Sequence, residues 1–128
     1  MKVERILLAL LIAGVAAFPA AAYSSPRPHT PTQVTIDLIA KNYVFDMSTI
    51  TVPAGAKVTI NFENEDVGIP HNFSLYDSSS ANNALFKGEV INGVNKITYT
   101  FTAPAKAGTY VFRSDLLPET MSGSFVVQ

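Results

Sequence analysis

The sequence of 128 residues contains no cysteine, and only 15% of it is charged, with a net charge of −1. The absence of cysteine excludes disulfides, thiolate metal ligands and a lipid-modified amino-terminal cysteine. The weak, mixed charge offers no basic surface for nucleic acid. A chain of this length allows one domain, which packing alone must hold together.

The first 22 residues predict a signal peptide. Lys2 and Arg5 precede an apolar run over residues 6–18, and Pro19 and three alanines at 20–22 follow it. A basic start, a short apolar segment and an Ala-x-Ala ending are typical of a secretory signal. The run is shorter than the roughly 20 residues that span a bilayer, although an uncleaved membrane anchor is a rival interpretation. We therefore expect export, to the medium, the periplasm or the cell surface.

A proline-rich tether is predicted next, over residues 23–32. Pro26, Pro28 and Pro31 stand close together there, and closely spaced prolines favour an extended, poorly packed chain. The folded domain is then expected over residues 33–128.

Apolar and polar residues alternate along several short segments of this domain. The clearest are residues 34–38, 58–62 and 96–102, and residues 71–75 predict a further strand with its apolar side chains on one face. Such alternation is typical of half-buried strands. Connections rich in Pro, Gly and Asn separate them, and residues 81–86 allow one helical turn at most. The pattern predicts an all-β sandwich of about six or seven strands.

Three segments, taken in order, share a distinctive arrangement. In the first, an aromatic motif at residues 42–45 leads to a Val-Pro-Ala-Gly turn at 52–55. In the second, Pro70 precedes His71, and the third is the strand, loop and closing strand of residues 108–127. Together they resemble cupredoxins such as plastocyanin and azurin. The resemblance covers residues 33–128 and implies a Greek-key β-sandwich or barrel of the cupredoxin type with about seven or eight strands.

A blue copper site of type 1 uses two imidazoles, one thiolate and a weak axial thioether. The resemblance assigns the first imidazole to His71 and the axial thioether to Met121. It assigns the thiolate position to Ser114 and the second imidazole position to Leu117. A serine hydroxyl stays protonated at neutral pH and leucine donates nothing, so neither is expected to bind metal. The resemblance therefore implies a degenerate copper site, and no cofactor is expected.

The remaining pair, His71 and Met121, has two interpretations. As a soft nitrogen–sulfur pair it could hold Cu(I) weakly, because soft ligands favour that ion over Zn²⁺. Alternatively, His71 makes local hydrogen bonds at a strand start while Met121 fills an irregular gap in the core. Leu117 favours the second interpretation because an apolar side chain would plug a former site. A copper-binding protein, with a weak Cu(I) site or with blue-copper electron transfer by descent, is the alternative function.

Two further clusters carry weaker signals. Glu63, Glu65 and Asp66 form an acidic group that lacks the spacing of a calcium loop and predicts a solvated turn. Ser114, His71 and Asp115 could suggest a catalytic triad, but the sequence contains neither a nucleophile elbow nor an oxyanion loop. We therefore expect no enzymatic activity.

The expected function is a non-enzymatic binding or structural module. Its partner would be an envelope or extracellular protein that docks on the loop edge formed by His71, Leu116, Leu117 and Met121, because exposed apolar patches often mark interfaces. Contact with a membrane is expected only if the amino-terminal segment remains uncleaved.

Overall fold

The computed structural model of the protein describes residues 28–128. The predicted signal peptide and the first half of the predicted tether lie outside the described residues. Residues 28–32 are exposed and carry no strand, and the chain enters its first strand at Gln33. Among the described residues no helix is long and apolar enough to cross a membrane.

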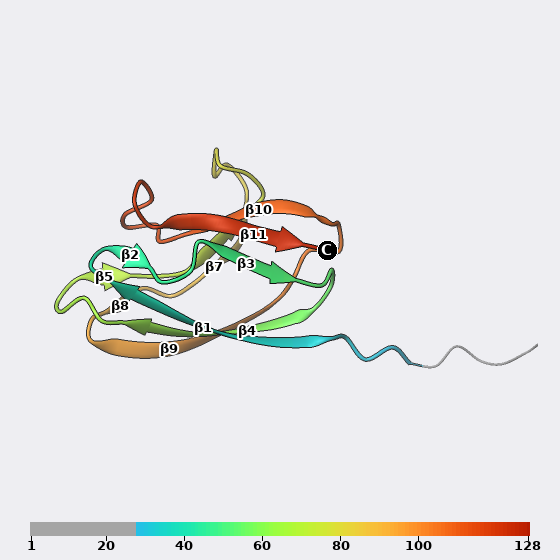
Figure 1. Ribbon diagram of the computed structural model, residues 1–128, viewed down its shortest axis with the longest axis horizontal. Helices are drawn as coiled ribbons and strands as arrows, with labels where there is room; N and C mark the ends of the chain where they lie inside the picture. The colour runs from blue at the N-terminus through green and yellow to red at the C-terminus, as the bar shows by residue number, and fades with distance from the viewer. Residues whose placement is uncertain (1–27) are drawn as a thin grey trace, which may run out of the picture.

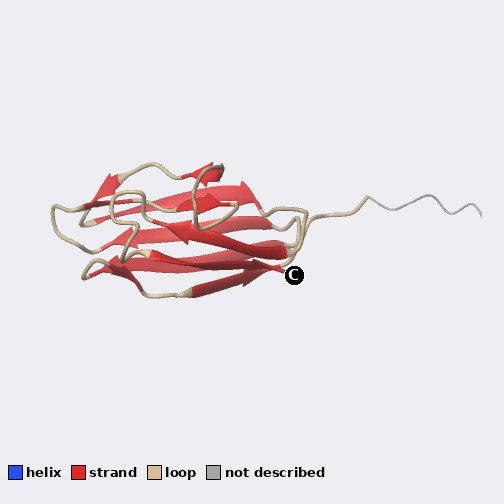
Figure 2. Cartoon of the chain, turned by 90° about the horizontal axis from the view of Figure 1, so that it is seen from above, coloured by secondary structure: helices blue, strands red, loops and turns tan. Residues whose placement is uncertain are grey.

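The described chain consists of strands and loops, without a helix. The strands, in chain order, are β1 (Gln33–Lys41), β2 (Val44–Phe45), β3 (Thr49–Val52), β4 (Lys57–Asn64), β5 (Pro70–His71), β6 (Ser74–Tyr76), β7 (Ala84–Lys87), β8 (Ile91–Asn92), β9 (Asn95–Thr102), β10 (Gly108–Arg113) and β11 (Ser122–Val127). Figure 1 shows them as two layers, and Figure 2 shows the strands running along the length of the molecule. The prediction of an all-β sandwich is confirmed.

The two layers are a sheet in the order β2-β1-β4-β9 and a sheet in the order β3-β11-β10-β6-β7. A small ribbon of β5 and β8 lies beside them. β1 pairs in parallel with β4, and β3 in parallel with β11, whereas the other neighbours are antiparallel. The parallel pairs arise because the chain crosses between the layers, with β2 in one layer and β3 in the other.

The core lies between the layers and is built by the predicted alternation. In β4, Val58, Ile60 and Phe62 are buried while Lys57 and Asn61 face solvent. A cluster of rings fills the centre, where Phe73 packs against four aromatic neighbours at centroid distances of 5.6–6.4 Å. Burying aromatic side chains of this size supplies much of the stability of a domain without disulfides.

The structure differs from the expected elements in two details. It has eleven strands rather than about seven or eight, because β2, β5 and β8 contain only two residues each; the remaining eight fall within the expectation. Within residues 81–86, where one helical turn was allowed, residues 84–86 belong to strand β7.

The single strand expected over residues 71–75 is also divided. His71 ends β5 in the small ribbon, whereas Leu75 belongs to β6 in the larger sheet. Every residue from His71 to Tyr76 is buried, so burial does not alternate there, and the alternating sequence of residues 71–75 gives no sign of the break.

Candidate functional site

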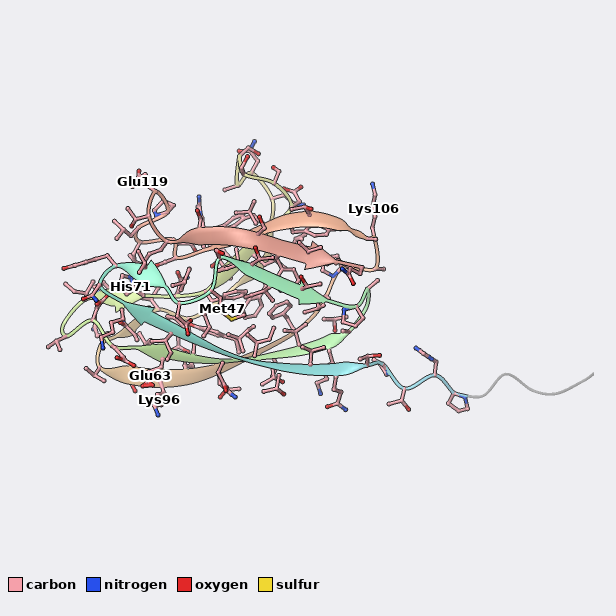
Figure 3. The ribbon with its side chains drawn as sticks, in the orientation of Figure 1. Met47, Glu63, His71, Lys96, Lys106 and Glu119 are labelled. Atoms are coloured by element: carbon pink, nitrogen blue, oxygen red, sulfur yellow. The ribbon has the colours of Figure 1, made fainter. Side chains whose placement is uncertain are left out.

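The residues singled out from the sequence lie at one end of the sandwich. In Figure 1 this end is on the left, where β2, β5 and the loop between β10 and β11 come together, opposite the carboxyl terminus. Figure 3 shows His71 at this end beside β2, with Glu119 on the loop above it. We refer to residues 114–121, which connect β10 to β11, as the site loop.

Backbone hydrogen bonds fold the site loop onto itself. The N–H of Ser114 donates to the carbonyl of Met121 at 2.9 Å, and the N–H of Met121 donates to the carbonyl of Leu117 at 3.0 Å. The N–H of Leu117 in turn donates to the carbonyl of Ser114 at 3.3 Å. The N–H of Asn72 reaches the Ser114 hydroxyl oxygen at 3.4 Å. The structure thus brings together all four positions that the resemblance selected.

Burial divides these four positions. His71, Ser114 and Met121 have an exposed fraction of 0%, whereas Leu117 is half-buried and packs against the core. Its neighbour Leu116 is 46% exposed. A depression of about 200 Å³ opens at this end, and its lining consists of Tyr43, Ile69, Pro70, His71, Leu116 and Leu117. Its lining residues are apolar or aromatic apart from His71.

His71 is held by a buried carboxylate. Its Nε2 lies 2.8 Å from Oδ2 of Asp66, whose side chain is 9% exposed. An ionised carboxylate only accepts hydrogen bonds, so the imidazole proton lies on Nε2. The other ring nitrogen, Nδ1, is buried without a hydrogen-bond partner among the described residues. Tyr43 packs its ring edge-on against the imidazole, with centroids 6.3 Å apart.

Asp66 also closes the turn between β1 and β2. Its two carboxylate oxygens accept the backbone N–H groups of Asn42 at 2.6 Å and Tyr43 at 3.0 Å. Burial alone would raise the pKa of Asp66, but the hydrogen bonds from Tyr43, His71 and Asn42 outweigh it and lower the pKa below 3.8. Asp66 is therefore an ionised carboxylate that joins the turn to the imidazole.

The prediction that the acidic group forms a solvated turn is wrong for Asp66. Glu63 and Glu65 are half-buried and lie on the surface, where they pair with Lys96 at 3.7 Å and Lys41 at 3.4 Å. Asp66 instead turns inward, because the amides of the β1–β2 turn and the imidazole supply three donors there. Sequence reasoning missed it as a site residue.

A second carboxylate, Asp115, ties the site loop to β6. It accepts hydrogen bonds from the hydroxyls of Ser74 and Tyr76, both at 2.6 Å, and from the Asn72 amide at 3.1 Å. The guanidinium of Arg113 adds a bond at 3.1 Å. Burial would raise the pKa of Asp115, but these donors together lower it to about 2.

The arrangement does not support a catalytic triad. The imidazole of His71 is paired with Asp66, and Asp115 is committed to β6 and Arg113. No hydrogen bond joins the Ser114 hydroxyl to His71 within residues 28–128. A triad requires an acid, a base and a nucleophile in one chain of hydrogen bonds, and this chain is broken at both links.

The donors present do not fit a type 1 copper site. His71 Nδ1 and the thioether of Met121 are retained, but the buried group at the thiolate position is a hydroxyl and the side chain at the second imidazole position is a hydrocarbon. Throughout the described part of the chain, no three His, Cys, Asp or Glu side chains gather in a metal-binding group. The thiolate is the strong ligand of a blue site, so its chemistry cannot arise from these residues.

A larger depression, of about 470 Å³, lies on the outer face of the β1–β4–β9 sheet. Its polar side chains already satisfy one another, because Asn61 donates to Asp37 at 3.0 Å and Lys96 pairs with Glu63 at 3.7 Å. This face is far less suited to a ligand than the end that carries His71.

Comparison with known proteins gives one family and several related structures. A family model described as "Cupredoxin-like domain" matches residues 8–127. Among characterised proteins, auracyanin-A of Chloroflexus aurantiacus is 29% identical over 105 residues, a match that spans 64% of this chain and 64% of that protein. The chain thus spans just under two thirds of the length of this relative.

The structural comparisons agree with that match. The structure of auracyanin A, a "blue" copper protein from the green thermophilic photosynthetic bacterium Chloroflexus aurantiacus, superimposes with a TM-score of 0.66 at 30% identity and covers 75% of this chain and 99% of that chain. Dithionite-reduced auracyanin from Roseiflexus castenholzii superimposes with a TM-score of 0.67 at 24% identity, over 76% and 98% of the two chains. The second likeness supports the fold alone.

Proposed function

Because the chain belongs to the family of cupredoxin-like domains, we propose that it is an exported, non-enzymatic binding module whose type 1 copper site is degenerate. The observation that carries this proposal is the pair of substitutions at the centre of the site, Ser114 and Leu117, which lie beside His71 and Met121. Without a thiolate and a second imidazole, the site lacks the ligands for blue-copper electron transfer.

The surface that would bind a partner is the apolar end around the site loop. Leu116 and Tyr43 are 46% and 49% exposed, and they flank the depression above His71. His71 and Met121 lie beneath this surface and make no contact with solvent. The partner would be an envelope or extracellular protein, with Leu116 and Leu117 as its main contacts.

This docking surface is tested with the double variant Leu116→Ser, Leu117→Ser. Crosslinking from the site loop in envelope extract should give a defined adduct with the unmodified protein and lose it in the variant. Leu85→Ser is the matched control, because Leu85 is 43% exposed on β7, outside the lining of the depression. Equal crosslinking by all three proteins would contradict the proposal.

Export is proposed from the amino-terminal sequence. Its basic, apolar and small-residue segments favour cleavage after Ala22. Amino-terminal sequencing of the protein recovered from its own cells should begin at Tyr23. A chain that begins at Met1 and remains with the membrane fraction would instead support the anchor.

A second candidate function, the binding of Cu(I), is favoured by one specific observation. Nδ1 of His71 is buried without a hydrogen-bond partner among the described residues, and Met121, which holds the axial thioether position in the resemblance, is also fully buried. Titration of the reduced protein with Cu(I), repeated with His71→Ala and Met121→Ala, tests this function. Affinity that is unchanged in both variants would end it.

A further inference from the structure

Strand β9 lies at the edge of its sheet, and only β4 pairs with it among the described residues. It is eight residues long, pairs without a register shift and contains no proline. The other strands that end a sheet of the sandwich are shorter, since β2 has two residues and β3 and β7 have four each. Figure 1 shows β9 as the last strand of its layer. Sheets usually shield such an edge with proline, a bulge, charges or a short strand, and β9 carries a single lysine near its start.

Two hydrogen bonds show which backbone groups of β9 face outward. The N–H of Ala103, directly after the strand, donates to the carbonyl of Ala56 at 2.8 Å, so the odd-numbered residues face β4. The N–H of Lys96 instead donates to Oδ1 of its neighbour Asn95 at 2.8 Å. Because backbone groups alternate along an antiparallel strand, the outward N–H and C=O groups belong to the even-numbered, exposed residues Lys96, Thr98, Thr100 and Thr102.

The opposite side of the same sheet is partly closed. There β2 pairs with Ala40 and Lys41 of β1. Asp46 then engages both backbone groups of Ile39, because its N–H donates to the Ile39 carbonyl at 2.9 Å and its Oδ1 accepts the Ile39 N–H at 2.8 Å. Only the first part of β1 remains open, and it carries the charged Asp37. The edge of β9 is therefore the longest one without such protection in residues 28–128.

We infer that β9 is a self-association surface, on which β9 of a second copy of this chain adds in antiparallel orientation. Two sheets of four strands each would then form one continuous sheet. Strand addition supplies partners for the free backbone groups of an edge, and alternating side chains determine which strand fits. A second copy fits because β9 offers the same free groups and the same alternation, with threonines on the outer face and Ile97, Tyr99 and Phe101 on the core face.

A two-fold axis at Tyr99 gives the register. It places Thr98 opposite Thr100 of the second copy and Lys96 opposite Thr102, so that lysine never faces lysine. Each such pair can exchange two backbone hydrogen bonds, because all of these residues direct their N–H and C=O groups outward. Threonines that face each other across antiparallel strands also form favourable side-chain pairs.

The two neighbouring registers fit less well. An axis at Thr100 would place Lys96 opposite Pro104, which has no N–H to donate. An axis at Thr98 would place Thr102 opposite Val94, which lies outside the strand. The axis at Tyr99 uses residues 96–102 alone, all of which belong to β9.

The second layer offers an apolar side chain near this axis. β7 lies over β9, since the rings of Phe86 and Phe101 stack with centroids 4.8 Å apart. Val90, in the connection after β7, is 45% exposed. It follows Glu89, whose carbonyl accepts the Tyr99 hydroxyl at 2.6 Å. A second copy that pairs about Tyr99 would cover apolar surface there as well as the strand edge.

This surface is separate from the apolar end around the site loop. No residue of β9 lines the depression above His71. Antiparallel pairing would direct the two site loops in opposite directions and leave both accessible. The inference therefore does not rest on the proposed function, and either can fail without the other.

The first experiment measures self-association by sedimentation velocity over a series of protein concentrations, with the same length of chain in every sample. The unmodified protein should form a dimer as its concentration rises. Thr100→Pro should remain a monomer, because proline removes an outward N–H and obstructs a second strand without breaking a bond to β4.

The matched control is Thr35→Pro on β1. The carbonyl of Thr32 accepts the N–H of Lys57 in β4 at 2.8 Å, so the N–H of Thr35 points away from β4 on the other open edge. This variant should dimerise as the unmodified protein does. A monomeric unmodified protein, a dimer that survives Thr100→Pro, or equal loss in both proline variants would overturn the inference.

The second experiment tests the register and does not depend on a proline variant that folds. The double variant Thr98→Lys, Thr100→Lys places like charges opposite each other across the axis and should weaken dimerisation by at least about tenfold. Thr98→Lys, Thr100→Glu places opposite charges there and should restore the dimer. Equal dimerisation of the two double variants would show that these positions do not face each other, and the pairing about Tyr99 would be wrong.

Discussion

Two carboxylates, Asp66 and Asp115, hold the site end of the sandwich together from different sides. Asp66 joins the β1–β2 turn to His71, and Asp115 joins the site loop to β6. In both, donors from other segments outweigh the cost of burial, so the folded protein keeps the charged form. Hydrogen bonds to ionised side chains thus tie the β1–β2 turn, the site loop and β6 together at this end.

Asp115 should make the protein sensitive to acid. Its pKa is 3.8 as the reference for the unfolded chain and about 2 in the folded protein. A folded-state pKa that is depressed gives stability that is fully present above the unfolded value and is lost as the pH falls from about 4 through about 2. Asp115→Asn should lower the free energy of unfolding at neutral pH by on the order of 2 kcal/mol and flatten this acid limb. Urea unfolding over a pH series measures both effects.

The control is Asp37→Asn, which removes one exposed carboxylate from the outer sheet face. A difference between Asp115→Asn and the unmodified protein that stays constant from neutral pH to about pH 2 would show that Asp115 does not titrate as the folded-state contacts require.

Met121 has a packing role that can be separated from any ligand role. Its side chain is fully buried and belongs to the hydrophobic core. Met121→Ala should lower the free energy of unfolding by about 2–5 kcal/mol because it leaves a cavity. Met121→Leu conserves volume and should cost less than about 1.5 kcal/mol. Chemical unfolding measures both values, and Cu(I) titration of Met121→Leu, which removes the sulfur but keeps the volume, tests a ligand role separately.

At the scale of elements, the β1–β2 turn is strained where it meets the site. Asn42 and Tyr43 have φ angles of 55° and 64°, the left-handed region, and their neighbours Lys41 and Val44 pair across a two-residue hairpin. Such turns favour Asn followed by Gly, so Asn42 suits its place and Tyr43 does not. The tyrosine ring packs edge-on against His71, which accounts for its presence at a strained position.

Tyr43→Gly should therefore separate stability from the shape of the site. Removal of the left-handed strain should stabilise the turn by about 1 kcal/mol, and loss of the ring should open the depression above His71. Thermal unfolding measures the change in stability, and the rate at which diethyl pyrocarbonate modifies His71 measures how far the depression has opened. Tyr43→Ala retains the strain and serves as the control; it should be less stable than Tyr43→Gly. The reverse order would show that strain is absent from this turn in solution.

The strands that were predicted from the sequence are those in which buried and exposed residues alternate regularly. Val58, Ile60 and Phe62 alternate because β4 has one face on the core and one in solvent. The break between β5 and β6 left no such signal, since both faces of that stretch are buried. The inward turn of Asp66 depends on amides that lie 23 and 24 residues earlier in the chain. Three acidic residues within four positions predict a solvated turn. Only the tertiary fold, which brings the donors of Asn42, Tyr43 and His71 to Asp66, buries one of the three.

The proximity of the four family positions at one end of the sandwich has a different origin. This proximity follows from the topology. β10 and β11 are antiparallel neighbours, so the site loop joins their adjacent ends, and β6, which follows His71, lies beside β10. Asn72 and Ser114 approach each other wherever that topology forms. Asp115 could have been identified as a site residue because it follows Ser114 in the sequence. The hydrogen bonds that it accepts from β6 could not have been predicted from the sequence.

At the scale of the whole molecule, the site and the chain entry lie at opposite ends. Figure 1 shows residues 28–32 leaving the sandwich on the side of the carboxyl terminus, away from β2, β5 and the site loop. Lys106, in the connection between β9 and β10, lies at that same far end in Figure 3. If the amino-terminal segment stayed uncleaved as an anchor, a domain held through residues 23–32 would present the apolar end around Leu116 away from the membrane.

The most demanding test asks whether Ser114 and Leu117 occupy the thiolate and second imidazole positions of the family. The double variant Ser114→Cys, Leu117→His restores the two missing donor types on a loop whose backbone is fixed by its own hydrogen bonds and by Asp115. Nδ1 of His71 has no hydrogen-bond partner among the described residues, and Met121 is buried on the site loop. If these positions converge as the resemblance implies, addition of Cu(II) should produce the intense thiolate-to-copper absorption of a blue site.

Each single variant supplies one of the two donors and is the control for the other, so neither should give that absorption at full intensity. Ser114→Cys at a fully buried position changes an oxygen to a sulfur with little change in volume, and circular dichroism should confirm that the sheets are retained. Such a result would mean that the strands and the two carboxylates, rather than a metal, determine where the site loop lies. The geometry of the site would then be retained although two ligand types have changed. A folded double variant that binds Cu(II) without the absorption would mean that positions 114 and 117 do not converge with His71 in solution, and the degenerate-site interpretation would fall with that result.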